Sequence, residues 1–340
     1  MTRPDVIIEN KIPFIKGLLE PICNVRYLAP EQITSQEMDS TDALITRTRT
    51  RCDASLLAGS RCRFIATATI GTDHIDLDYC RANGITVANA PGCNAPAVAQ
   101  YVMSVVGNWL NATGRSAAGT VLGVVGVGHV GSIVVQWARA NGLKTLCCDP
   151  PRAAEGDNSE NFALLEQLAA ECDIITFHTP MTRHGAYPTF HMAGKSFFSS
   201  LRRQPLLINS ARGPVIDTPA LIDALDAGLV GAASIDCWEN EPKIDRRLLD
   251  QAYVATPHIA GYSLEGKKRA TQMAVRALTS FFGLPEPAIA DAAPSGWPSA
   301  PSLEAIMSSY NPAVDTAALR ADATTFETLR NTYNYRPEVR

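Results

Sequence analysis

The sequence predicts an α/β protein that contains two parallel β-sheets, each covered by helices. Two series of short apolar runs alternate with segments of helical pattern, and this alternation is typical of parallel sheets. A glycine-rich turn between a strand and a helix opens the second series. The length of 340 residues fits two domains, since a domain has roughly 150 residues.

The first series predicts a domain over residues 1–95, completed by a helix that returns to it within residues 264–284. Helical patterns over Phe14–Leu19 and Asp53–Leu57 separate its strands. The strands are expected at Val6–Ile8, Ala43–Thr46, Phe64–Thr67 and Thr86–Ala88.

The second series predicts a domain over residues 96–263, entered through an apolar helix over residues 97–112. Residues 285–301 are rich in Pro, Ala and Ser and predict a linker. Residues 302–340 predict a short segment that is too small to fold alone and packs on the body or on a partner subunit. The strands of this domain are expected at Val121–Val125, Thr145–Cys148, Ile174–Phe177, Leu206–Ile208, Ala232–Ile235 and Tyr253–Ala255.

Composition excludes several classes of protein. The net charge of −4 argues against a general nucleic-acid-binding protein, and no apolar run approaches the ~20 residues of a membrane helix. The nine cysteines form no Cys-x-x-Cys pair, which favours reduced thiols in the cytoplasm over a disulfide framework. Cys147 and Cys148 are interpreted as small apolar strand residues, with redox sensing as the alternative. No cluster of Cys, His and carboxylates has metal-ligand spacing, so no metal is expected.

The glycine-rich turn predicts a dinucleotide site. Its glycines permit a tight bend, close approach of a pyrophosphate and close helix–strand packing, and the following helix N-terminus faces the phosphates. Asp149 lies eighteen residues after the turn, where a carboxylate would bind the adenosine ribose hydroxyls and repel a 2′-phosphate. NAD is therefore the expected cofactor. Because Arg152 could bind a 2′-phosphate, NADP stays an alternative. A glycine-rich turn without a ligand, followed by a solvated aspartate, is the non-functional interpretation. The turn itself consists of Gly126, Val127, Gly128, His129, Val130 and Gly131.

Three polar residues follow successive predicted strands of the second sheet and predict catalytic chemistry. His258 is the candidate acid/base, because a histidine exchanges a proton near neutral pH. Glu241 is the candidate carboxylate that orients this histidine, and Arg212 the candidate clamp for a substrate carboxylate. Each alone could be an ordinary loop residue, but the ends of neighbouring parallel strands gather beside a ligand crevice. The other histidines are weaker candidates, since they lack this setting or, for His129, lie in the glycine-rich turn.

At this point the chain resembles the D-isomer-specific 2-hydroxyacid dehydrogenase family over most of its length. The resemblance implies a flavodoxin-like substrate domain, a Rossmann NAD-binding domain and a shortened C-terminal dimerisation segment at residues 302–340. Besides Arg212, Glu241 and His258, it is carried by residues 9–13, 66–76, 90–95, 148–152 and 258–267.

Within that family, the resemblance implies NAD-dependent oxidation of 4-phospho-D-erythronate to (3R)-3-hydroxy-2-oxo-4-phosphooxybutanoate in pyridoxal 5′-phosphate (vitamin B6) biosynthesis. It implies a cytoplasmic homodimer with Arg212, Glu241 and His258 as catalytic residues. Further substrate contacts are implied at Thr48, which stands where serine is expected, and at Thr69 and Tyr262. Further NAD contacts are implied at Asp149, Thr179, Ser210, Ala211, Arg212, Asp236 and Gly261.

The alternating residues Arg47, Arg49 and Arg51 would share one face of a strand and could bind a substrate phosphate, with Arg47 the strongest candidate. A solvated loop is the alternative for this run. Two other functions stay open: a dehydrogenase of another D-2-hydroxy acid, such as 3-phosphoglycerate or glycerate, and a non-catalytic NAD-sensing corepressor on the same fold.

Overall fold

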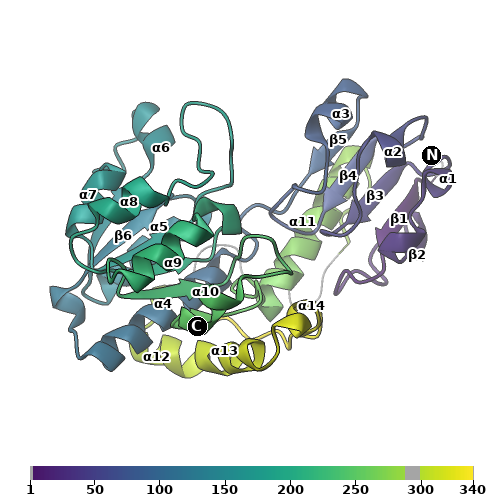
Figure 1. Ribbon diagram of the computed structural model, residues 1–340. Coiled ribbons are helices and arrows are strands. Elements are labelled where there is room, and N and C mark those ends of the chain that lie inside the picture. The colour runs from purple at the N-terminus through teal and green to yellow at the C-terminus, as the bar shows by residue number, and fades with distance from the viewer. Residues whose placement is uncertain (1–2, 288–298, 340) are drawn as a thin grey trace. The chain divides into compact units, whose positions relative to one another are not determined.

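The computed structural model describes residues 3–287 and 299–339 and divides them into two compact units (Figure 1). The first unit contains residues 3–94 and 263–287, and the second contains residues 95–262 and 299–339. Part of the predicted linker, residues 288–298, lies outside the described residues.

The first unit is built on a five-stranded parallel sheet with the strand order β2-β1-β3-β4-β5. Helices lie on both faces, with α1 (Ser35–Met38), α2 (Ala54–Leu57), α3 (Leu77–Ala82) and the long α11 (Leu264–Phe282). Separate apolar clusters fill the two faces, and α11 contributes Ala270, Ala274 and Leu278 to one of them. The strands are β1 (Asp5–Glu9), β2 (Asn24–Leu28), β3 (Ala43–Thr46), β4 (Phe64–Thr67) and β5 (Thr86–Ala88).

Two features of this unit differ from the sequence prediction. Strand β2 was not predicted, because it lies at the edge of the sheet and its residues are at most partly buried, so no apolar run marks it. Residues 14–19 form turns rather than the predicted helix. Phe14 and Gly17 have positive φ angles of 62° and 87°, which no α-helix accommodates.

The second unit is built on a six-stranded parallel sheet with the order β11-β10-β9-β8-β6-β7. The first step of this sheet runs outward from β6 to β7, and the chain then crosses back to β8, so the loops after β6 and β8 meet where the strand order reverses. All six strands were predicted within one or two residues. They are β6 (Val121–Val125), β7 (Lys144–Cys148), β8 (Ile174–Phe177), β9 (Leu206–Asn209), β10 (Ala232–Ile235) and β11 (Val254–Ala255).

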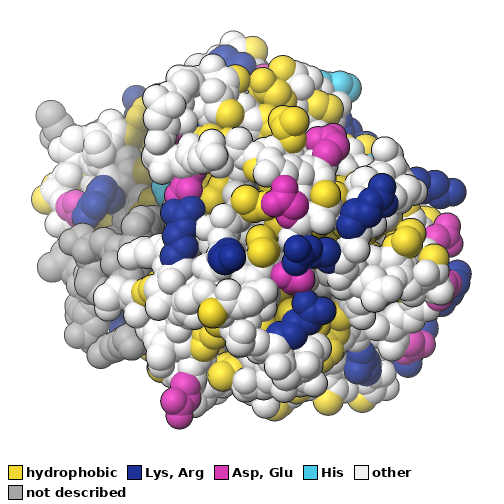
Figure 2. Space-filling view, turned by 90° about the vertical axis from the view of Figure 1, so that its left-hand side faces the viewer, with side chains coloured by type: hydrophobic (Ala, Val, Ile, Leu, Met, Phe, Trp, Pro, Cys, Tyr) yellow, Lys and Arg dark blue, Asp and Glu magenta, His cyan; other side chains and the backbone are white. Residues whose placement is uncertain are grey.

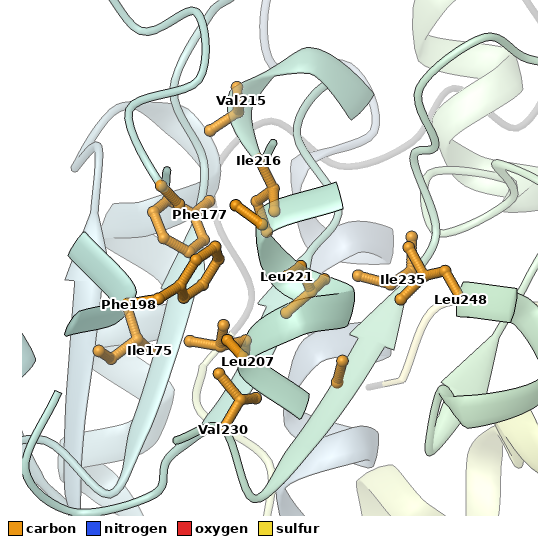
Figure 3. Close-up of a cluster of buried hydrophobic side chains, with 14 of the residues drawn as sticks. Ile175, Phe177, Phe198, Leu207, Val215, Ile216, Leu221, Val230, Ile235 and Leu248 are labelled. Carbon is orange, nitrogen blue, oxygen red and sulfur yellow. The ribbon is translucent and has the colours of Figure 1, made fainter. Parts of the chain in front are cut away.

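Apolar side chains cover both faces of this sheet. On one face, α4 (Ala95–Thr113) and α5 (His129–Ala140) form a buried cluster with strand residues. On the other face, Phe177, Phe198, Leu207 and Leu221 meet in a second cluster, shown in Figure 3. Residues from the helices on this face complete the second cluster; these are α7 (Leu165–Glu171), α8 (Lys195–Ser200), α9 (Thr218–Asp226) and α10 (Arg246–Gln251).

The C-terminal segment folds onto the second unit as α12 (Leu303–Ser309), α13 (Pro312–Ala321) and α14 (Phe326–Asn331). Ser104 in α4 donates to the Tyr310 carbonyl at 2.7 Å, and the buried Leu319 and Phe326 join the apolar cluster of Figure 3. Thr316 accepts the Ala255 N–H at 3.1 Å, so α13 covers the edge strand β11. These contacts make the segment an integral part of the unit.

All nine cysteines are free and buried, which agrees with reduced thiols and with an apolar role for Cys147 and Cys148. Across the residues that the structure describes, no helix has the length and apolar character needed to cross a membrane. Figure 2 shows one face of the molecule, where both basic and acidic side chains lie among apolar and uncharged groups. This face carries no continuous field of one sign.

Candidate active site

The three candidate catalytic residues follow three adjacent strands. Arg212 lies three residues after β9, Glu241 six residues after β10, and His258 three residues after β11. These strands are neighbours in the parallel sheet, so the loops at their carboxyl ends leave the same edge. The second unit therefore brings all three residues to one place.

His258 and Glu241 form a hydrogen-bonded pair. Glu241 Oε2 lies 2.8 Å from His258 Nδ1, and Glu241 Oε1 accepts the Trp238 N–H at 2.8 Å. Both side chains are only partly exposed, 28% for His258 and 19% for Glu241. Burial alone would raise the pKa of Glu241, but His258, the Trp238 N–H and Arg330 together hold it below its usual value. The ionised carboxylate accepts Nδ1–H and leaves Nε2 available to exchange a proton.

The loop that carries His258 is held by Asp236. Its Oδ1 accepts the Ile259 N–H at 2.8 Å and the Thr256 hydroxyl at 2.7 Å, and its Oδ2 accepts the Ala260 N–H at 3.0 Å. Only 1% of Asp236 is exposed. Burial raises the pKa of this carboxyl, against the lowering effect of His258 and of its hydrogen bonds. The visible role of Asp236 is thus to shape the loop of His258, and its predicted NAD contact stays a prediction.

Arg212 is fixed by a close approach of two loops. A Cβ at Gly213 would lie 1.9 Å from the Trp238 carbonyl oxygen, so only glycine allows this contact. Asn209 donates to the carbonyl oxygens of Arg212 at 3.0 Å and Cys237 at 3.3 Å. The loop of Arg212 is therefore attached to the loop that ends in Glu241.

Cys237, Glu241 and His258 have potential metal-ligand atoms within 4.8 Å of one another. The geometry favours the acid/base pair over a metal centre. Burial and the nearby carboxylates raise the pKa of the Cys237 thiol well above its usual value. The facing atoms of Glu241 and His258 already bond to each other.

The glycine-rich turn has the geometry that a dinucleotide requires. A Cβ at Gly131 would lie 2.1 Å from the Gly126 carbonyl oxygen, and one at Gly126 would lie 2.9 Å from the backbone of His178. At Gly128, by contrast, a Cβ would meet nothing within 4 Å. Gly128 precedes α5, whose first turn has no side-chain cap. Open space in front of uncapped N–H groups fits a pyrophosphate.

Asp149 and Arg152 are both engaged at this turn. Asp149 Oδ2 accepts the Val127 N–H at 2.8 Å, and Asp149 also caps α6 (Pro150–Ala154). Arg152 donates to the Val127 carbonyl and pairs with Asp157 at 2.6 Å. Because Asp157 and Val127 occupy the Arg152 guanidinium, the structure gives no support to a 2′-phosphate site there.

Two further NAD candidates lie at strand ends of the same sheet. Thr179 follows β8, next to Gly126 across the turn. Ser210 follows β9, and its buried hydroxyl has no hydrogen-bond partner among the residues that the structure describes. A buried hydroxyl without a partner is costly, so this atom is a natural site for a ligand contact. Ala211 and Gly261 lie in the loops of Arg212 and His258.

The first unit holds the substrate candidates Arg47 and Thr69 at the ends of β3 and β4. The buried Glu9 accepts the Arg47 N–H at 2.9 Å, and Arg47 Nη1 donates to the Lys11 carbonyl at 3.1 Å. Thr69 accepts or donates a hydrogen bond with Thr67 at 2.6 Å, while Thr48 is exposed.

The expectation that three arginines share a strand face is wrong. Strand β3 ends at Thr46, and the chain bends over the next residues, so the period of two does not apply. Arg51 turns to Asp53 at 2.7 Å.

The assessment of the other histidines needs one correction. His191 Nε2 lies 2.7 Å from Glu239 Oε1, and its Nδ1 lies 3.6 Å from Asp217, so this histidine does have carboxylate neighbours. Nothing in the local sequence places it there, since its partners are 26 and 48 residues away. Desolvation lowers the pKa of both His74 and His178, which makes them poorer bases.

Two arginines of the C-terminal segment reach this site and were not predicted. Arg330 Nε donates to the Tyr262 hydroxyl at 3.1 Å. Arg336 donates to backbone carbonyls of the loop after His258, among them Ile259 at 3.1 Å. Tyr262 also contacts the rings of Tyr333 and Tyr335 edge-on, with centroids 6.1 and 6.2 Å away.

Comparison with known proteins identifies the family. Residues 96–260 match the model of the NAD-binding domain of D-isomer-specific 2-hydroxyacid dehydrogenases. The chain is 44% identical to an erythronate-4-phosphate dehydrogenase of Bacteroides thetaiotaomicron and 46% identical to one of Bacteroides fragilis. Each alignment covers 98% of this chain and 97% of the relative.

The fold is also similar to that of a solved dehydrogenase structure. The crystal structure of D-lactate dehydrogenase from Aquifex aeolicus, complexed with NAD and lactic acid, aligns with a TM-score of 0.67 at 25% identity, over 82% of this chain and 95% of that one. The chain therefore belongs to the D-isomer-specific 2-hydroxyacid dehydrogenase family, as a relative of the erythronate-4-phosphate dehydrogenases.

Proposed function

We propose that this protein oxidises 4-phospho-D-erythronate to (3R)-3-hydroxy-2-oxo-4-phosphooxybutanoate with NAD, as a step of pyridoxal 5′-phosphate biosynthesis. The near full-length identity to erythronate-4-phosphate dehydrogenases supports the substrate. The single observation that carries the chemistry is the 2.8 Å hydrogen bond between His258 and Glu241.

His258 takes the proton of the C2 hydroxyl on Nε2. Glu241 accepts Nδ1–H throughout, fixes the ring and stabilises the imidazolium that forms. NAD, when bound, accepts the hydride that leaves C2. As the hydroxyl oxygen loses its proton and C2 loses a hydride, the alcohol becomes a ketone, and the proton on His258 is later released to solvent.

Arg212 binds the substrate carboxylate and keeps C2 in place. A guanidinium can donate two parallel hydrogen bonds to a carboxylate, and this fixes the orientation of the reacting carbon. Its loop is tied to the Glu241 loop through Gly213 and Asn209, so the clamp and the base are positioned by the same backbone.

The remaining contacts belong to the same proposal. The glycine-rich turn before α5 holds the pyrophosphate of NAD, and Ser210, after β9, is a further candidate donor to the cofactor. Arg47, Thr48 and Thr69 of the first unit, and Tyr262 of the second, bind substrate oxygens. Among them, Arg47 is the candidate for the phosphate.

The direct test measures NADH formation with 4-phospho-D-erythronate, 3-phospho-D-glycerate and D-glycerate, each with and without an added 2-oxo acid. Preference for 4-phospho-D-erythronate supports the proposal, and turnover only with the 2-oxo acid means that the cofactor is retained between cycles. Preference for 3-phospho-D-glycerate or D-glycerate would show that the proposed substrate is wrong and that the preferred acid takes its place. NAD binding without turnover of any of them would favour the sensor.

We also propose that the protein is a homodimer in the cytoplasm. The resemblance of residues 302–340 to a shortened dimerisation domain supports the dimer, and the nine free cysteines support the cytoplasm. Light scattering on the purified chain tests the assembly, since a mass of 36.5 kDa would identify a monomer and twice that mass a dimer.

A further inference from the structure

The C-terminal segment supplies a buried cation to the loop that carries the catalytic histidine. Arg336 lies beyond the last helix, α14, and is only 7% exposed. Its guanidinium stacks on the Tyr310 ring, 4.3 Å from the centroid. A buried arginine is costly to desolvate, so the contacts that it makes define its role.

These contacts are mostly backbone carbonyls of one loop. Arg336 Nη1 donates to the carbonyl oxygens of Ile259 at 3.1 Å and Tyr262 at 3.3 Å, and Nη2 donates to that of Ala260. Nη2 also donates to the Ala97 carbonyl at 3.1 Å, in the first turn of α4. The planar guanidinium therefore ties the loop to the long helix beneath it.

Two side chains of opposite charge hold the backbone of this loop, one through its N–H groups and the other through its carbonyl groups. The Asp236 carboxylate accepts the N–H groups of Ile259 and Ala260, while Arg336 donates to the carbonyls of the same two residues. His258 directly precedes them and has a positive φ of 57°, which a non-glycine residue adopts only when its surroundings enforce it. Glu241 holds the His258 ring from one side, while Asp236 and Arg336 hold the backbone that follows it.

We propose that Arg336 is a positioning residue for His258, and that the C-terminal segment thereby forms part of the catalytic machinery. Arg330 extends the same arrangement, since it donates to the Tyr262 hydroxyl at the far end of the loop. Without Arg336, the carbonyls of Ala260 and Tyr262 lose its hydrogen bonds, and the Ile259 carbonyl keeps the Tyr262 N–H at 2.8 Å. The loop then relaxes away from Glu241. The inference rests on the proposed function in so far as its kinetic readout uses that reaction.

The chain offers a matched control. Arg320, in α13, also reaches from the C-terminal segment to backbone carbonyls, those of Leu249 at 3.3 Å and of Ala252. These carbonyls belong to α10 and its end, outside the loop of His258. Arg320→Gln and Arg336→Gln thus remove the same chemistry from the same segment, at two different attachments.

The experiment compares kcat, KM, melting temperature and hydrogen–deuterium exchange of residues 256–264 in both variants and in Arg336→Lys. We expect Arg336→Gln to lower kcat by about 100-fold, the effect of a small misplacement of a catalytic group, and to speed exchange in that peptide. Arg336→Lys should recover part of both effects. Arg320→Gln should lower the melting temperature but leave kcat and the exchange of residues 256–264 unchanged.

Two results would overturn the inference: unchanged kcat and unchanged exchange in Arg336→Gln, or equal losses of kcat in both variants that follow their melting temperatures. If Arg336→Gln does not fold, Arg336→Lys carries the comparison. Hydrogen–deuterium exchange needs no turnover, so the positioning role can be tested even if the wild-type protein rejects 4-phospho-D-erythronate. Failure of the proposed function and failure of this inference are therefore separate outcomes.

Discussion

The pair of His258 and Glu241 is the smallest unit on which the chemistry depends. Its 2.8 Å hydrogen bond leaves one imidazole nitrogen for the substrate, and the partly buried setting keeps the pair together. His258→Ala should lower kcat by about 10²- to 10⁴-fold, the usual contribution of a general base. NAD affinity, measured by fluorescence titration, should be unchanged. Loss of NAD binding as well would mean that His258 is structural.

The lowered pKa of Glu241 links stability to pH. Burial opposes ionisation, but His258 and the Trp238 N–H lower the pKa in the folded state. The stabilising contribution is therefore present above the pKa of the unfolded chain, about 4.3, and is lost as pH falls through the folded value. Urea unfolding at pH 3 to 7 measures the free energy of unfolding of the wild type and of Glu241→Gln. The wild type should be more stable than the variant by the largest margin near neutrality and by the smallest margin in acid. A constant difference would contradict this linkage.

Sequence reasoning found the residues of this pair but not their surroundings. A carboxylate after one predicted strand and a histidine after the next were enough to predict Glu241 beside His258, because the ends of parallel strands converge. The partners of His191 and the contacts of Arg336 join residues far apart in the chain, and no local pattern records them. Such contacts become visible only when the helices have packed.

At the scale of elements, the turn from β6 into α5 contains one glycine that is needed for folding and another that is needed for cofactor binding. Gly131 is required by packing, since a Cβ there would lie 2.1 Å from a carbonyl oxygen, whereas Gly128 faces open space. Gly131→Ala should lower the melting temperature of the apoprotein. Gly128→Ala should leave it unchanged but weaken NAD binding at least tenfold in a titration, because a methyl group would occupy the space of the pyrophosphate. Equal effects of the two substitutions on stability would refute this division.

The elements of the second unit were predictable for a physical reason. Strands buried on both faces, such as β6 and β8, are nearly continuous apolar runs, and such runs stand out in a sequence. The edge strand β2 lacks this signal, and the turns at residues 14–19 were mistaken for a helix because Phe14 and Leu18 have helical spacing. Backbone geometry at Phe14 and Gly17 overrides that spacing.

At the scale of the molecule, the second unit contains the candidate acid/base pair and the glycine-rich turn, and Arg330 and Arg336 of its C-terminal segment contact the loop of His258. The first unit carries the substrate candidates Arg47, Thr48 and Thr69 beside the strand ends of a sheet of its own. The relatives from Bacteroides align over 97% of their length, so the C-terminal segment is shared with them. Its role at the site could not be predicted, since a lone arginine before proline gives no signal.

One measurement tests the central claim, hydride transfer from C2 with His258 as the base, most directly. 4-Phospho-D-erythronate carrying deuterium at C2 is mixed with the protein and NAD in a single turnover, and the reduced nicotinamide is analysed for deuterium. The account predicts that the deuterium appears in the nicotinamide, that the labelled substrate reacts more slowly, and that His258→Ala forms the labelled product about 10²- to 10⁴-fold more slowly than the wild type. Deuterium released to water, or reduced nicotinamide without label, would contradict it.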